Sequence, residues 1–127
     1  MNPEKVVFGF FIVLALTLNF GFVIGDIDNP AHHDKWDFFA VIVVNLIATV
    51  LKFGDRSQVG ALLLATSLVA ILQLSAAALV WIIAVYGTAA GMAPGTMATI
   101  VSLAAGALVA NVISVVLLVI ETFLLRR

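Results

Sequence analysis

The chain contains no cysteine and few charged residues. Without cysteine among its 127 residues, disulfides, thiolate metal sites and cysteine nucleophiles are excluded. Charged residues make up 10% of the chain and hydrophobic residues 64%, whereas a soluble domain averages about 25% charged and about 45–50% apolar residues. Both departures indicate an integral membrane protein, and the length suits a single domain over residues 1–127.

Motifs of the common catalytic and binding classes are also missing. The sequence has no basic tract of the kind that binds nucleic acid, no nucleotide-binding glycine loop, no HExxH motif and no recognisable Ser-His-Asp set. We therefore expect no enzymatic activity, no catalytic residue, no cofactor and no nucleic-acid partner. The partners that remain to consider are the lipid bilayer, other copies of the chain and small ions.

Long apolar stretches predict an all-α fold of four transmembrane helices with short connections. A hydrocarbon core about 30 Å thick needs about 20 mainly apolar residues in a helix. The first stretch could also be a signal peptide, but it is longer than the roughly 7–15 apolar residues of that class. The predicted spans are residues 6–25, 30–53, 59–86 and 96–125.

The second span is the least obvious, because its apolar run covers only residues 38–51. Asn29 is a favourable N-cap residue, and Pro30 suits the first position of a helix, where its missing N–H costs nothing. A helix from Pro30 to Phe53 would be about 36 Å long. The sequence therefore predicts one continuous helix that begins among the polar residues and crosses the membrane.

The distribution of basic residues predicts the topology. Positive charge concentrates on the cytoplasmic side of membrane proteins, and five of the six basic residues lie at the termini or between the second and third spans. Both termini are therefore expected in the cytoplasm and residues 26–37 outside, in a plasma membrane or bacterial inner membrane. The five residues are Lys5, Lys52, Arg56, Arg126 and Arg127, and Lys35 is the sixth.

Polar residues line one face of the second predicted span. At 100° per residue, Asp34, Asn45 and Lys52 fall within about 20° of one another, and Asp37 and Thr49 lie within about 60° of that line. Polar residues inside a membrane usually face a bundle interior or an aqueous path, and an acidic mouth concentrates cations. The alternative is that Asn45 bonds to another helix while Lys52 reaches toward lipid headgroups.

Small and amide residues at four-residue spacing indicate helix packing faces. Asn19 lies on the opposite face of the first span from Gly21, which predicts a different neighbour for each. Glu121 is expected to pair with Arg126 or Arg127. A single small bundle cannot use all of these packing faces, so a homo-oligomer is predicted. The predicted packing residues are Gly21, Gly25, Gln73, Ser102, Gly106, Ala110, Asn111 and Ser114.

The polar segment before the second span could hold a metal ion. His33 and Asp37 are four residues apart, so on a helix they could share one divalent ion. The alternative is a solvated helix start whose acidic residues complement the helix dipole.

These patterns leave two functional hypotheses. The leading one is a small homo-oligomeric membrane pore or transporter for inorganic cations, with Asp34 and Asp37 at its outer mouth. Asn45, Thr49 and Lys52 would line its pathway. The alternative is a non-conducting accessory or scaffold subunit of a larger membrane complex, in which the same polar face docks a partner.

Overall fold

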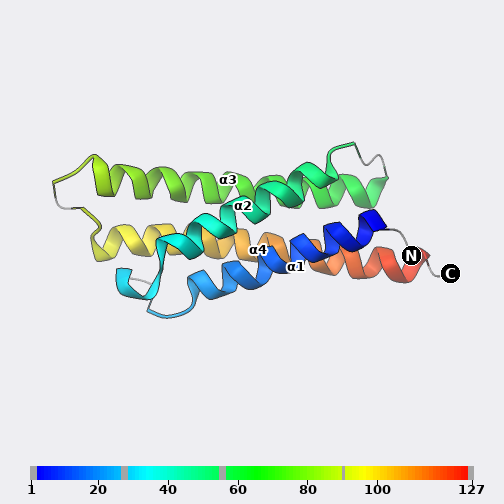
Figure 1. Cartoon of the computed structure of the whole chain (residues 1–127), viewed down its shortest axis with the longest axis horizontal. Coiled ribbons are helices and arrows are strands. Elements are labelled where there is room, and N and C mark those ends of the chain that lie inside the picture. Colours follow the sequence, from blue (N-terminus) through cyan, green and yellow to red (C-terminus); the bar gives the residue numbers. More distant parts are fainter. Residues whose placement is uncertain (1–2, 27–28, 55–56, 90, 126–127) are drawn as a thin grey trace.

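The protein is a bundle of four α-helices (Figure 1), seen in a computed structural model that describes residues 3–26, 29–54, 57–89 and 91–125. The helices are α1 (Pro3–Val23), α2 (Lys35–Lys52), α3 (Gln58–Tyr86) and α4 (Pro94–Leu125), and a short 3-10 helix, η1 (Pro30–His32), precedes α2. Each helix packs mainly on two others, in the order α1, α2, α3, α4 and back to α1. We call the end that carries η1 the η1 end, and the end where α1 begins and α4 ends the terminal end.

Three of the helices, α1, α3 and α4, are long and apolar enough to cross a membrane. Large apolar side chains on their outer surfaces, including Phe10, Leu72 and Phe123, are exposed, which suits contact with lipid. The helix α2 is different, because it has 18 residues and includes Lys35, Asp37 and Lys52. The chain is thus an all-helical protein of membrane character in which three spans are evident.

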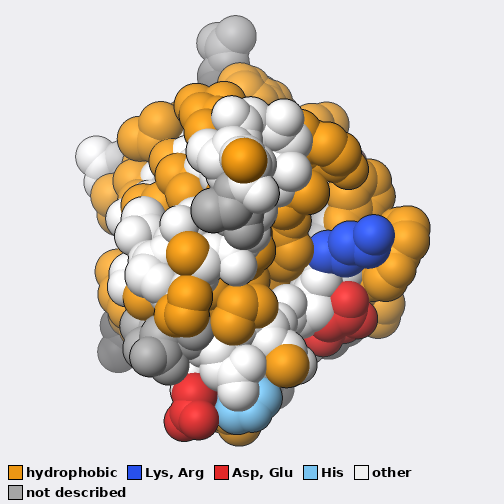
Figure 2. All heavy atoms as spheres, turned by 90° about the vertical axis from the view of Figure 1, so that its left-hand side faces the viewer, with side chains coloured by type: hydrophobic (Ala, Val, Ile, Leu, Met, Phe, Trp, Pro, Cys, Tyr) orange, Lys and Arg blue, Asp and Glu red, His pale blue; other side chains and the backbone are white. Residues whose placement is uncertain are grey.

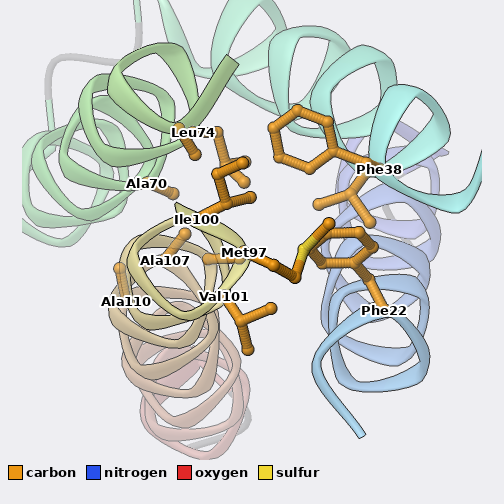
Figure 3. Close-up of a cluster of buried hydrophobic side chains, with 12 residues drawn as sticks. Phe22, Phe38, Ala70, Leu74, Met97, Ile100, Val101, Ala107 and Ala110 are labelled. Carbon is orange, nitrogen blue, oxygen red and sulfur yellow. The ribbon is translucent and has the colours of Figure 1, made fainter. Parts of the chain in front are cut away.

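The interior contains two separate apolar clusters. Toward the η1 end, the aromatic core cluster gathers Phe22, Phe38, Leu74, Met97 and neighbouring small residues from all four helices (Figure 3). Toward the terminal end, the terminal core cluster consists of Phe8, Ile12, Ala48 and Leu63, with partly buried side chains packed around them. The two clusters leave a short stretch of each helix between them.

The predicted continuous helix from Pro30 to Phe53 is wrong at its start. Asn29 does cap a helix, since its Oδ1 accepts from the Ala31 N–H at 2.9 Å, but that helix is η1. His33 then adopts an extended backbone, and α2 begins only at Lys35, capped by Asp34. The extended backbone accompanies a buried His33 ring, whose Nδ1 lies 2.6 Å from the Phe22 carbonyl oxygen and whose Nε2 lies 2.8 Å from that of Asp26.

The two glycines predicted to pack the first span, Gly21 and Gly25, are placed differently in the structure. Because α1 ends at Val23, Gly25 lies in the turn beyond it and has a φ of 108°. A Cβ there would lie 2.9 Å from the Cβ of His32, so the position requires glycine for the turn. Gly21 is exposed, with nothing within 4 Å of a Cβ built on it. Neither glycine packs α1 against another helix of the same chain.

Candidate functional site

A set of buried polar side chains occupies the space between the two core clusters. Each helix contributes at least one of them: Asn19 between Ile12 and Phe22, Asn45 between Val41 and Ala48, Ser67 between Leu63 and Ala70, and Asn111 directly after Ala110. These four are essentially fully buried. Gln73, whose Oε1 is also buried, lies next to them beside Ala70 and Leu74 of the aromatic core cluster. We call these five residues the polar layer.

Contacts between α1 and α2 fix the level of Asn45. The rings of Phe22 and Phe38 lie 5.0 Å apart at one end of this pair, and Lys52 Nζ lies 4.3 Å from the Phe8 ring centroid at the other. Ala15 and Asn45 are midway between these contacts on their respective helices. A short, buried alanine side chain on α1 therefore lies level with the buried amide of α2.

Contacts of α4 bring its amide to the same level. On the α3 side, Thr66 Oγ1 lies 2.6 Å from Ser114 Oγ, and the Gln73 amide lies against Gly106. Ser67 and Asn111 fall between these two contacts, within a turn of each other.

The α1 register completes the set. A Cβ at Gly9 would contact Leu118 Cδ2 at 3.4 Å. The helices α1 and α4 are antiparallel, so ten residues after Gly9 on α1 correspond to ten residues before Leu118 on α4. Asn19 therefore lies level with Leu108, between the levels of Gly106 and Asn111. At 1.5 Å per residue the polar layer is about 10 Å deep along the bundle, from the level of Gln73 to that of Ser67.

Most polar atoms in this layer have no hydrogen-bond partner within the described part of the chain. This holds for both amide atoms of Asn19 and of Asn111, for Asn45 Oδ1, for Ser67 Oγ and for Gln73 Oε1. Asn45 Nδ2 does have a partner, since it donates to the Val41 carbonyl oxygen at 2.8 Å. Buried polar groups are paired in the great majority of cases, and leaving one unpaired costs about 1–3 kcal/mol. So many within about two helical turns is the most unusual feature of the molecule.

The polar face predicted for the second span divides into two parts. Asn45, Thr49 and Lys52 are buried inside the bundle, and Thr49 Oγ1 donates to the Asn45 carbonyl oxygen at 2.8 Å. Asp34 and Asp37 are exposed at the η1 end, where Asp34 Oδ1 accepts from the Trp36 N–H at 3.2 Å. Figure 2 shows two separate groups of acidic side chains near the margin of this end, one beside a histidine and one beside a basic side chain, while apolar side chains cover much of the rest. The exposed acids therefore do not encircle a central opening.

Charged groups close the interior at the terminal end. Lys5 Nζ lies 2.9 Å from Glu121 Oε1, and the Glu121 side chain is 10% exposed. Glu121 therefore has a basic partner on α1, whereas its predicted partners, Arg126 and Arg127, lie outside the described residues. The Lys5–Glu121 pair and Lys52, which lies over the Phe8 ring, thus place ionic groups beside the terminal core cluster at the terminal end.

The predicted packing residues of α3 and α4 differ in their placement. Ala110, Asn111 and Ser114 are buried, and Gly106 is in contact with Gln73 because a Cβ there would overlap the Gln73 amide. Ser102 is exposed on α4. The sequence analysis missed Ser67, although it belongs to the buried stripe of α3 at three- and four-residue spacing, with Gly60, Leu63 and Ala70.

No group of three or more potential metal ligands occurs among the described residues. His33 is 2% exposed, and each of its ring nitrogens lies within hydrogen-bond distance of a carbonyl oxygen. Asp37 is exposed in the first turn of α2. The metal site at His33 and Asp37 stays a prediction to which this geometry adds no further ligand.

The comparison with known proteins places the chain in a family. A family model described as "Family of unknown function (DUF6394)" matches residues 32–122, well over half of the chain. The chain belongs to this family. The DUF6394 match takes in α2, α3 and most of α4, and with them Asn45, Ser67, Gln73 and Asn111, whereas Asn19 lies before it. No curated protein and no solved structure matches the chain.

Proposed function

We propose that the protein is a small membrane pore or transporter for inorganic cations, with its pathway inside each four-helix bundle. The observation that carries the proposal is the polar layer, in which side chains of all four helices present unpartnered polar atoms to the bundle interior. Polar residues inside a membrane protein usually face the bundle interior or a water-filled path, and these have no partner on a neighbouring helix among the described residues. A structural protein would gain stability by replacing these groups with apolar ones.

The pathway proposed here follows the buried face of α2. It begins beside Asp34 and Asp37, which attract cations to the η1 end, and continues past Asn45 and Thr49 to Lys52. In this proposal α2 is a fourth span of about 27 Å, both termini are cytoplasmic, and the η1 end faces outward. The excess of basic residues at the terminal end supports this orientation.

Aromatic rings close the pathway between the η1 end and the polar layer. Phe38 stacks on Trp81 with ring centroids 5.2 Å apart, and Phe22 lies 5.0 Å from Phe38. Hydrophobic constrictions of this kind gate channels by excluding water. We therefore propose a gated pore or an alternating transporter, and this conformation would be its closed state.

The second candidate is an accessory or scaffold subunit of a larger membrane complex. It is favoured by Gly21 and Ser102, small residues that are exposed on α1 and α4, because small residues let another transmembrane helix approach closely. The same surfaces suit the homo-oligomer that we propose for the pore, so they do not distinguish the two functions.

Cation flux into liposomes distinguishes them. We expect the reconstituted wild-type protein to conduct, and Asn45→Leu to lower the flux about tenfold, which corresponds to about 1.4 kcal/mol in the barrier. Ser102→Ala is the control, because Ser102 is exposed on α4 and should leave the flux unchanged. A folded wild-type protein without flux would favour the scaffold subunit instead.

A further inference from the structure

We infer that the polar layer is a binding site for one partly dehydrated monovalent inorganic cation. The inference rests on the proposed function, because it names the class of ion and the residues that hold it. It starts from the unpartnered atoms of the layer, which are mainly oxygens: the amide oxygens of Asn19, Asn45, Gln73 and Asn111 and the hydroxyl of Ser67.

The orientation of the amides favours oxygen ligands. Asn45 Nδ2 donates one hydrogen bond to the Val41 carbonyl oxygen, and Oδ1 is the unpartnered end of that amide. Neither end of the Asn19 and Asn111 amides has a partner among the described residues, so rotation can turn either oxygen inward. Rings of neutral oxygen dipoles replace the hydration shell of a monovalent cation in selective pores.

Two small residues lie at the levels of the amides. Ala15, fully buried on α1, lies level with Asn45, and Gly106 faces the Gln73 amide from α4. A longer side chain at Gly106 would overlap that amide.

The charge of the layer selects against other ions. None of its five residues is ionisable, whereas sites for Ca²⁺ and Mg²⁺ use carboxylates to offset the cost of dehydration. The acid nearest along α4, Glu121, is paired with Lys5 at the terminal end. An anion would need donors, whereas five of the seven buried unpartnered atoms of the layer are oxygens. A single positive charge among neutral oxygens is the ligand that this composition fits.

A cation held by residues of all four helices stabilises the folded bundle, which provides a test independent of flux. We expect the melting temperature of the purified protein to rise by about 5 °C or more when choline chloride is replaced by one of LiCl, NaCl, KCl or RbCl at equal concentration. Choline is too large to be held by these oxygens. MgCl₂ at matched ionic strength should leave the melting temperature at the choline value.

Variants of the layer assign the effect to these residues. Ser67→Ala should at least halve the cation-dependent rise, whereas Ser102→Ala, the same change on an exposed serine, should preserve it. Asn111→Leu should abolish the rise without lowering the melting temperature in choline, because it removes an unpartnered buried amide.

Three outcomes would overturn the inference. A melting temperature that is the same in all chloride salts would mean that water, or amides paired with each other, fills the layer. A fall for Asn111→Leu in every salt would mean that Asn111 only joins helices. A cation effect that Asn111→Leu retains would place the ion elsewhere. A cation-selective rise in melting temperature without cation flux would support the binding site and contradict the transport function. Cation flux without any rise in melting temperature would support the transport function and contradict the binding site.

Discussion

Replacing Phe38 with alanine is expected to raise the cation flux at least tenfold and to lower the stability of the folded protein. Phe38 is 6% exposed, and it stacks on Trp81 and packs against the tilted ring of Phe22 between the η1 end and the polar layer. Truncation leaves a cavity in this position, and Phe→Ala changes in cores cost about 3–5 kcal/mol. The same truncation removes the ring that separates the η1 end from the Asn45 amide.

Phe39→Ala is the matched control, because the neighbouring ring is 61% exposed and faces away from the interior. Flux into liposomes and chemical denaturation in detergent give the two quantities. An increase in flux for Phe39→Ala as large as for Phe38→Ala would point to general loosening of the bundle. An unchanged flux in a folded Phe38→Ala protein would contradict a pathway that passes through the aromatic core cluster.

Introducing a fixed positive charge at residue 111 is expected to stop cation flux. Asn111 is fully buried on α4, level with Asn45 and Ser67. An ammonium about 5 Å from a permeating cation raises its energy by about 3 kcal/mol at an effective dielectric constant of about 20. Such a barrier slows passage by more than about 100-fold. A lysine at the centre of a membrane helix costs about 2.5–3.5 kcal/mol, so folding must be verified by size-exclusion chromatography and circular dichroism.

Asn111→Met separates the effect of charge from that of size, because methionine is similar in length to lysine but carries no charge. We expect Asn111→Met to lower the flux about tenfold, through loss of one amide, and Asn111→Lys to lower it much further. Equal flux through the two folded variants would show that permeating cations do not pass α4 at this level.

The three apolar helices could be predicted from the sequence almost to their ends. The predicted spans 6–25, 59–86 and 96–125 correspond to α1 (Pro3–Val23), α3 and α4, because uninterrupted apolar runs end at glycine, proline or charge. The start of α2 could not be predicted in the same way. Both Asn29 and Asp34 are good caps, and the choice between one helix and two depends on the contact of His33 with the Phe22 carbonyl oxygen, which lies 11 residues earlier.

The candidate site could be predicted only along α2. Helical periodicity alone puts Asn45, Thr49 and Lys52 on one face, and all three are buried. The partners of Asn45 on the other helices depend on how α1, α3 and α4 are rotated in the bundle, which their nearly uniform apolar character does not reveal. Ser67 was missed for this reason. Gly21 and Ser102, predicted as packing residues, are exposed.

The central claim is that each bundle contains its own cation pathway, and mixing subunits tests it most directly. Wild-type protein and Asn45→Leu are co-reconstituted in liposomes at several ratios and constant total protein, and cation flux is measured at each ratio. Because Asn45 is buried inside its own bundle, each wild-type subunit should conduct independently, and flux should fall linearly with the fraction of variant. A steeper decline, in which one variant subunit silences its neighbours, would put the pathway between subunits and contradict the account.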